Sequence, residues 1–254
     1  MTCFIEDLHN TIRDATVIDL STTLEIGIPR WPTHPPLLVG AAATHARDGY
    51  ANQWLALGEH TGTHIDAPYH IHGDQSELTV DQIELTAVIG RAVVLDLSFK
   101  AWEPGERAGI EDIMNALSDY PTGIREGDIV LACFGWMKYW KTTGEWAEYA
   151  SNQPGFTEEA ADFFIEKKIR AIGTDTAAVG TPIKAGQSGR CYFHEKVLRE
   201  QIYLIECLNN LEQLPRSCFF MALPLKIKGG SGSPIRAIAL TSREARSRWG
   251  RGAL

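Results

Sequence analysis

The sequence lacks the cysteine pattern of a disulfide-stabilised protein. Its five cysteines are odd in number, widely spaced and without a C-x-x-C pair: Cys3, Cys133, Cys191, Cys207 and Cys218. Disulfide frameworks of small secreted domains normally use an even number of cysteines at closer spacing. We therefore expect free, mostly buried thiols and a cytoplasmic protein.

A segment that could place the chain in a membrane is also missing from the sequence. No run of apolar residues approaches the roughly 18 that a membrane-spanning helix needs. Residues 1–14 contain Glu6, Asp7 and Asp14 and lack the apolar stretch of a signal peptide. We expect neither a signal peptide nor a membrane partner.

An excess of positive charge is absent as well. The formal net charge is -8, which argues against a general surface for nucleic acid or anionic lipid. The basic residues that do cluster lie at 243–251, which we interpret as a solvated tail or a contact between subunits. We expect no nucleic-acid partner.

Residues that can form a core are plentiful. The chain has 254 residues, of which 44% are hydrophobic, and contains no internal repeat or low-complexity linker. We expect a single domain over residues 1–254. Strand-like apolar runs occur at 15–20, 53–57, 92–97, 129–134, 171–173, 202–208 and 235–240, and helix-like segments at 109–117, 157–168 and 193–201. Because strands and helices interleave, the fold class is mixed α/β.

One stretch of eleven residues contains several side chains that can bind a metal ion or transfer a proton. It reads His60-Thr-Gly-Thr-His64-Ile-Asp66-Ala-Pro-Tyr-His70. In a straight strand its two ends would lie roughly 33 Å apart, because a strand rises about 3.3 Å per residue. A single metal ion needs its ligand atoms about 2.0–2.2 Å away. We therefore expect the chain to curl here, with Gly62 permitting a positive φ and Pro68 ending the strand.

The residue types in this stretch favour a divalent metal ion. Two imidazoles and a carboxylate, from His60, His64 and Asp66, suit Zn²⁺, Mn²⁺ or Fe²⁺ and leave positions open for water and substrate. His70 could be a further ligand or the general acid and base, and His72 could be peripheral. A lone histidine is more often an ordinary core or surface residue, but three around one aspartate in eleven residues favour the metal site.

The stretch resembles the signature of the cyclase family, which includes bacterial kynurenine formamidases and isatin hydrolases. Other segments resemble that family in the same order along the chain. They are Gly27-Ile-Pro-Arg-Trp31-Pro32, Gly173-Thr-Asp175-Thr176, His194 with Glu206, Ala222-Leu-Pro224-Leu225-Lys226 and Gly232-Ser233-Pro234-Ile-Arg236. The resemblance implies a swivelling β/β/α-type fold and a homodimer or homotetramer.

The resemblance also implies a second half of the metal site. His194 and Glu206 would be distal ligands, Asp66 and Glu206 would bridge two ions, and His60 and His64 would bind one of them. The sequence supports Glu206 independently, because a carboxylate in the otherwise apolar run 202–208 is costly unless it is paired or bound to a metal. An ion-paired edge glutamate, and for His194 a plain helix-start residue, are the alternatives.

Two further residues are candidates by the same resemblance. Trp31 would stack on an aromatic substrate, or instead pin its proline-rich loop to the core. Asp175 would orient a ligand histidine from behind, or instead be a turn or cap aspartate. The chain departs from formamidase-like members after Thr176, with Ala177-Ala178 where Pro-Ser is frequent, and this departure bears on the substrate rather than on the type of reaction.

Together these features predict a metal-dependent amidohydrolase with Zn or Mn as one or two ions. Hydroxide generated at the metal would attack a non-peptide amide, and His70 would pass a proton to the leaving nitrogen. The resemblance implies that the substrate is an N-formyl aromatic amine such as N-formylkynurenine, or a lactam such as isatin.

Two other classes stay open at the level of sequence. His64-x-Asp66 with a later histidine is also how a 2-His-1-carboxylate Fe(II) oxygenase site begins. A non-catalytic protein that binds a metal or a small ligand would use the same residue types, with a filled coordination sphere.

Overall fold

The computed structural model describes residues 3–118, 120–145, 147–184 and 187–244. The basic segment expected at 243–251 therefore lies, from residue 245 onward, outside the described residues. Within the described residues no helix combines the length and the apolar character needed to cross a bilayer.

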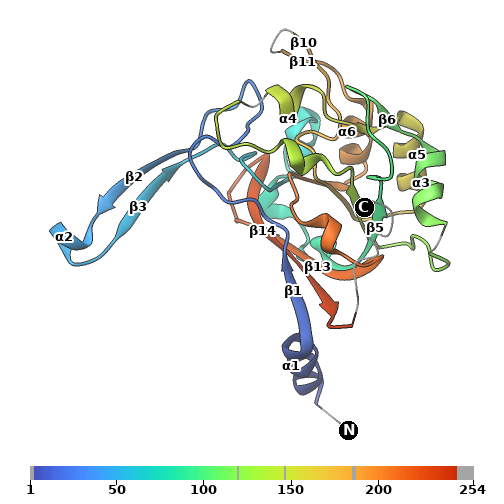
Figure 1. Ribbon diagram of the computed structural model, residues 1–254, viewed down its shortest axis with the longest axis horizontal. Helices are drawn as coiled ribbons and strands as arrows, with labels where there is room; N and C mark the ends of the chain where they lie inside the picture. The colour runs from blue at the N-terminus through green and yellow to red at the C-terminus, as the bar shows by residue number, and fades with distance from the viewer. Residues whose placement is uncertain (1–2, 119, 146, 185–186, 245–254) are drawn as a thin grey trace, which may run out of the picture.

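A closed sheet forms the centre of the molecule (Figure 1). The strand order is β1-β14-β13-β5-β7-β9-β12-β4, and β4 pairs again with β14, which closes the sheet into a barrel. Its strands are β1 (Ala15–Asp19), β4 (His64–Asp66), β5 (Ile89–Asp96), β7 (Ile129–Cys133), β9 (Ala171–Thr174), β12 (Tyr203–Glu206), β13 (Ser217–Pro224) and β14 (Gly232–Ser242). The long strand β14 makes closure possible, because residues 232–234 pair with β4 and residues 238–242 pair with β1.

Helices cover one side of the parallel part of this sheet. Strands β5, β7, β9 and β12 run parallel to one another, and the helices are α3 (Ile110–Leu117), α5 (Glu158–Glu166) and α6 (Tyr192–Arg199). Helix α5 begins as its sequence predicts, because the Thr157 hydroxyl accepts a hydrogen bond from the amide of Ala160. The predicted mixed α/β class is confirmed.

Two apolar clusters divide the core. One fills the barrel and contains Ile65 and Ile205; the other lies between the sheet and the helices and contains Leu204, Phe164 and Phe193. Alternate residues of a strand point to opposite faces. Since Ile65 and Ile205 face the barrel interior, their neighbours on β4 and β12 point outward toward α6.

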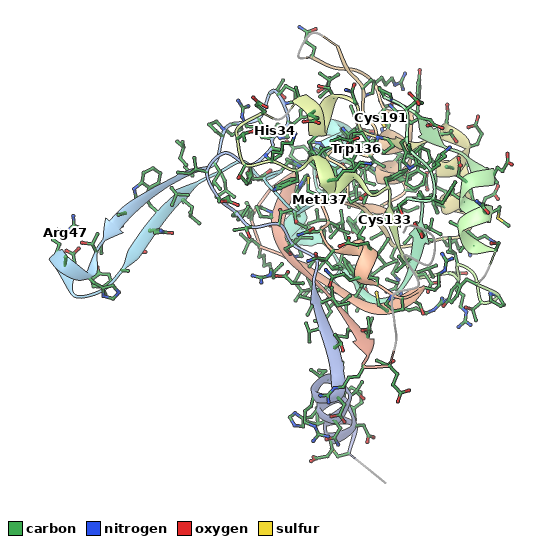
Figure 2. The ribbon with its side chains drawn as sticks, viewed as in Figure 1. His34, Arg47, Cys133, Trp136, Met137 and Cys191 are labelled. Carbon is green, nitrogen blue, oxygen red and sulfur yellow. The ribbon has the colours of Figure 1, made fainter. Side chains whose placement is uncertain are left out.

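Two elements project from this body. The arm consists of β2 (Leu38–Ala43), α2 (His45–Asp48) and β3 (Asn52–Ala56), with Arg47 at its far end (Figure 2). Helix α1 (Phe4–Asp14) projects elsewhere and has no buried residue. Neither α1 nor β2 is among the predicted elements, whereas each predicted strand and helix overlaps an observed one.

Short elements complete the chain. They are the paired strands β6 (Arg107–Ala108) and β8 (Gly155–Phe156), the paired strands β10 (Ile183–Lys184) and β11 (Gln187–Ser188), helix α4 (Ala147–Ser151), and the 3-10 turns η1 (Pro68–His70), η2 (Gly73–Gln75), η3 (Val80–Gln82), η4 (Leu85–Val88), η5 (Trp136–Tyr139) and η6 (Leu211–Gln213). Of these, η1 matters most for the site, because Pro68 ends β4 and redirects the chain toward His70.

Candidate metal centre and active site

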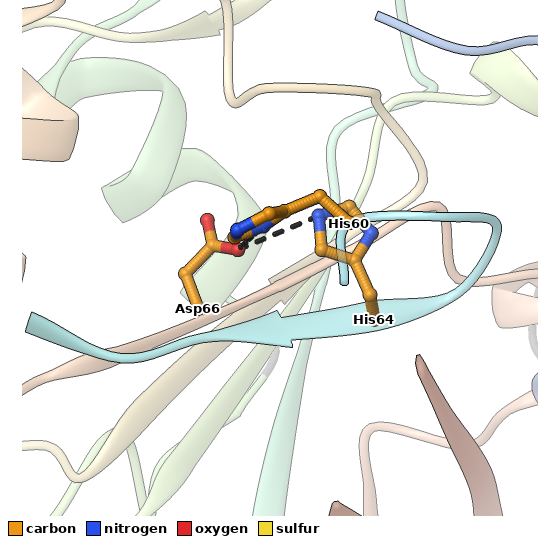
Figure 3. A group of neighbouring side chains, drawn as sticks. All are labelled: His60, His64 and Asp66. Atoms are coloured by element: carbon orange, nitrogen blue, oxygen red, sulfur yellow. Dashed lines mark hydrogen bonds and ion pairs between the residues drawn. The ribbon is translucent and has the colours of Figure 1, made fainter. Parts of the chain in front are cut away.

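Strands β4 and β12 place one histidine and two carboxylate side chains on the same face of the sheet. The two strands are antiparallel, with Glu206 opposite His64 and Leu204 opposite Asp66. Since Ile65 points into the barrel, His64 and Asp66 both point the other way, as Figure 3 shows. The strand period of two thus places His64, Asp66 and Glu206 together beneath α6.

The predicted curl of the 60–66 segment is confirmed. Gly62 has a φ of 64°, in the left-handed region that favours glycine. A Cβ on Gly62 would also lie 2.8 Å from Leu24 Cδ2. The turn brings one ligand atom each from His60, His64 and Asp66 to within 4.8 Å of one another, so these residues could hold a metal ion.

Helix α6 adds His194 to the same cluster. Its Nε2 lies 3.2 Å from Asp66 Oδ2, and the side chain is buried. Asp66, His70 and His194 form a second group whose ligand atoms lie within 4.8 Å of one another. Asp66 therefore presents Oδ1 to His60 and His64, and Oδ2 to His194.

Glu206 lies between His64 and His194 but belongs to neither of the two three-residue groups. Its Oε2 is 3.3 Å from His64 Nε2, and its Oε1 is 3.9 Å from His194 Nδ1. Oε1 is fully buried and has no hydrogen-bond partner. A buried carboxylate oxygen without a partner is costly, and a cation would remove that cost.

The hydrogen bonds of His64 provide a direct test of whether a metal fits. His64 Nδ1 lies 2.8 Å from the carbonyl oxygen of Gly62, which can only accept, so Nδ1 carries the proton. In the neutral ring Nε2 then has only its lone pair, and that lone pair faces oxygens of Asp66 and Glu206. Three acceptors converging on one point need a proton or a cation among them, and a divalent metal ion fits this nitrogen and oxygen donor set.

Burial and neighbouring charge shift the pKa values of Asp66 and Glu206 in opposite directions. Burial alone would raise the pKa of Asp66, but His60, His70 and His194 outweigh it and hold that pKa well below its usual value. Burial raises the pKa of Glu206 well above its usual value, and the charge of Asp66 adds to the effect. Two carboxylates in one buried site compete for the available positive charge.

His70 lies at the edge of the cluster, against a cavity. Its ring centroid is 4.0 Å from that of His60, and the side chain is only partly buried. Burial lowers the pKa of His70 to about 3, with Asp66 opposing the change. The His70 imidazole is therefore neutral near pH 7, and one of its ring nitrogens carries a lone pair.

A cavity of about 300 Å³ opens beside these residues, within the size range of small-molecule sites. Trp31, the residue expected to stack on an aromatic substrate, lines this cavity and donates its indole N–H to the hydroxyl of Ser188. His34, Tyr149 and Cys191 also line it; Figure 2 labels His34 and Cys191.

Among the described residues, Asp175 forms no hydrogen bond or ion pair with these histidines. Its buried carboxylate accepts hydrogen bonds from the backbone amides of Phe134 at 2.9 Å and Trp136 at 2.7 Å. The backbone carbonyl of Asp175 accepts from the hydroxyl of Tyr149. The alternative interpretation of Asp175, a turn-holding aspartate, therefore describes its contacts better than orientation of a ligand histidine.

His72 is peripheral to the cluster. Its Nε2 lies 2.8 Å from the backbone carbonyl of Glu195, so it ties the loop after β4 to α6 rather than contributing to the site.

Sequence reasoning missed three residues near the site. His34 has its ring centroid 5.6 Å from that of His60, and burial lowers its pKa to about 4. Ser231 and Glu59 bind each other behind His60. The position of Glu59 directly before His60 is the only local signal that could have indicated any of them.

Comparisons with known proteins agree with this geometry. The Cyclase family model matches residues 18–181. An isatin hydrolase from Roseibium aggregatum is 31% identical over 82% of this chain and 82% of its own length. A kynurenine formamidase from Bacillus cereus is 25% identical over 87% of this chain and 95% of its own length.

The solved structures give the same result for the fold. The structure of an isatin hydrolase bound to the product analogue thioisatinate superposes with a TM-score of 0.82 at 27% identity, covering 96% of this chain and all of the other chain.

Proposed function

The chain belongs to the cyclase family, and on that premise we propose that it is a metal-dependent hydrolase of non-peptide C–N amide bonds. The observation that carries the proposal is the convergence of Nε2 of His64 with carboxylate oxygens of Asp66 and Glu206. Oε1 of Glu206 has no hydrogen-bond partner there, and the cluster lies beside a cavity. A filled structural metal site would not need the neighbouring cavity.

The ion in this proposal is Zn²⁺ or Mn²⁺, bound by His60, His64 and Asp66. A second ion would lie on the other side of Asp66, with His194 and Glu206. In support, Asp66 and Glu206 each have one oxygen toward His64 and the other toward His194, the arrangement of bridging carboxylates. Nitrogen and oxygen donors of this kind suit either metal.

When bound, a divalent ion would supply hydroxide near neutral pH, because it lowers the pKa of water toward about 7. His70 acts as the proton carrier in this proposal. Its neutral imidazole takes the proton of the attacking water as the oxygen bonds to the carbonyl carbon. It then gives that proton to the leaving nitrogen as the C–N bond breaks, which leaves a carboxylic acid and an amine.

The substrate would be a small aromatic amide. The cavity of about 300 Å³ is lined by the rings of Trp31 and Tyr149, which favour a planar aromatic group. The relatives named isatin hydrolase and kynurenine formamidase suggest the two candidates, a cyclic amide such as isatin and an N-formyl aromatic amine such as N-formylkynurenine.

One assay series tests the proposal. The protein is stripped of metal with a chelator, reloaded with Zn²⁺ or Mn²⁺, and assayed with N-formylkynurenine, isatin and small lactams side by side. We expect hydrolysis of at least one substrate to disappear with the metal and to return on reloading, with air or without it. Amide hydrolysis that survived metal removal would refute the mechanism, and a requirement for O₂ and Fe²⁺ would indicate the oxygenase alternative.

We also propose that the chain associates with further copies of itself, as a homodimer or homotetramer. The projecting α1 and the arm both expose large apolar side chains, including Phe4, Leu8, Trp54 and Leu55, and an isolated two-stranded arm is only marginally stable in water. Light scattering coupled to gel filtration would give the mass in solution, and a monomer at micromolar concentration would contradict this part. The free thiols of Cys133, Cys207 and Cys218 fit a cytoplasmic location.

A further inference from the structure

Behind His60, on the side away from Asp66, lies a pair of residues with no part in the proposed reaction. The carboxylate oxygen Oε2 of Glu59 accepts two hydrogen bonds from Ser231, one from its amide at 2.8 Å and one from its hydroxyl at 2.7 Å. The hydroxyl oxygen of Ser231 in turn lies 2.8 Å from Nε2 of His60. The three residues form a continuous chain of hydrogen bonds.

The direction of each bond in this chain follows from counting protons. A serine hydroxyl has one proton, and the bond to Glu59 uses it. The oxygen of Ser231 can therefore only accept from His60, so Nε2 of His60 carries a proton. The other ring nitrogen, Nδ1, lies 2.6 Å from Asp66 Oδ1. In the metal-free protein a proton on Nδ1 would complete this contact, and a bound ion would take the place of that proton, so that Nδ1 offers the ion a lone pair.

The backbone holds this arrangement in place. Ser231 immediately precedes the stretch of β14 that pairs with β4, and its carbonyl accepts from the amide of Ala67. On either side of Ser231 a glycine lets the chain approach. A Cβ on Gly232 would lie 2.5 Å from His60 Cε1, and a Cβ on Gly230 would lie 2.8 Å from Glu59 Oε1.

We propose that Glu59 and Ser231 are positioning residues that hold His60 as the Nε2–H tautomer, so that its Nδ1 lone pair is directed at the ion beside Asp66. This inference rests on the proposed metal-dependent function. Groups that fix the tautomer of a ligand histidine typically change metal affinity or activity by about 10- to 100-fold when they are removed.

The test measures metal affinity and tautomer rather than turnover. Zn²⁺ binding to the metal-free full-length protein is measured by competition with a chromogenic chelator, and ¹⁵N spectra of the Zn²⁺-loaded protein distinguish protonated from unprotonated ring nitrogens of His60. We expect Ser231→Ala to weaken Zn²⁺ binding by about 10- to 100-fold. The matched control is Ser233→Ala, two residues further along the chain, where the hydroxyl binds Leu225 and Pro234 instead, and its Zn²⁺ affinity should equal that of the wild type.

Two variants of Glu59 distinguish a change in the His60 tautomer from a general loss of stability. Glu59→Gln keeps an oxygen that accepts from Ser231 and should keep the Nε2–H tautomer. Glu59→Leu frees the serine hydroxyl to donate to His60, and should shift His60 toward the Nδ1–H form and weaken Zn²⁺ binding.

The outcomes are distinct. A wild-type protein that bound neither Zn²⁺ nor Mn²⁺ would remove the proposed function itself. A wild-type protein that bound Zn²⁺ with His60 protonated at Nδ1, or a Ser231→Ala variant that bound Zn²⁺ as tightly as the wild type, would overturn only this inference. The tautomer measurement needs no substitution, so it stands even if a variant fails to fold.

Discussion

Glu206 lies directly opposite His64 in the antiparallel pairing of β12 with β4, and its Oε2 is 3.3 Å from His64 Nε2. The two residues are 142 positions apart in the sequence. The register between β12 and β4 therefore brings the carboxylate of Glu206 next to the turn that holds His60 and His64. In this way it connects the two halves of the site. The predictions below follow from this arrangement.

Glu206→Gln should have opposite effects on the protein with and without metal. Without metal, the substitution removes a buried carboxylate whose Oε1 has no partner, and should stabilise the fold by about 1–3 kcal/mol near pH 8. With Zn²⁺ present, it removes a charged ligand and should weaken binding by at least about 10-fold, since even residues behind the ligands contribute that much. Urea unfolding of both proteins, with chelator and with excess Zn²⁺, measures both effects. If Glu206→Gln destabilised the metal-free protein, Oε1 would have a favourable partner in solution.

His70→Ala should bind metal like the wild type but lose turnover by about 10²- to 10⁴-fold, the usual contribution of a general acid or base. Metal content by elemental analysis and turnover on the accepted substrate test this together. The control is His72→Gln, two positions away, whose side chain binds the backbone carbonyl of Glu195; it should retain both metal and activity. Loss of the metal from His70→Ala would make His70 a ligand, as its proximity to Asp66 and His194 allows.

Gly232→Ala should disturb the metal site through sterics alone. Its added Cβ would lie 2.5 Å from His60 Cε1 and 2.7 Å from the carbonyl of Ile65, so the ring or the strand must move. We expect a loss of about 1–3 kcal/mol in the free energy of unfolding and weaker Zn²⁺ binding. Gly73→Ala is the control, because nothing lies within 4 Å of the position of its Cβ. Equal stability and affinity in the two variants would show that His60 is loosely packed.

Asp175 should make the protein less stable as the pH rises from 4 to 7. Burial raises its pKa to about 6, against an ordinary value of 3.8. The folded state therefore binds more protons than the unfolded state between these two values, and stability falls as the pH rises through this window. The difference between these two pKa values corresponds to up to about 3 kcal/mol of folding free energy.

Chemical denaturation of the wild type and Asp175→Asn at pH 4, 5, 6 and 7 checks this prediction. The advantage of the wild type over Asp175→Asn should shrink as the pH rises, because asparagine does not titrate. Asp81→Asn is the control: hydrogen bonds from Thr79 and Gly229 lower the pKa of Asp81 to about 2, so its removal should leave the pH 4–7 profile unchanged. A constant difference between the wild type and Asp175→Asn would contradict the raised pKa.

The sequence by itself determined the local parts of this protein. The period-two pattern of 64–66 and of 203–206 fixed which side chains share a face, and Gly62 and Pro68 fixed the curl that gathers His60, His64 and Asp66. These features depend on backbone conformations of a few adjacent residues, which local sequence dictates. The helix starting after Thr157 is predictable for the same reason.

Only the tertiary structure decided how distant segments meet. Resemblance to the family suggested His194 and Glu206, but their distances to Asp66 and His64 depend on strand register and on α6 packing against the sheet. The same is true of Ser231 behind His60 and of Asp175, whose carboxylate binds backbone amides instead of a histidine. Such contacts arise from the packing of the whole core and the closure of β14 onto β4, where many distant residues contribute jointly and no short segment carries the information.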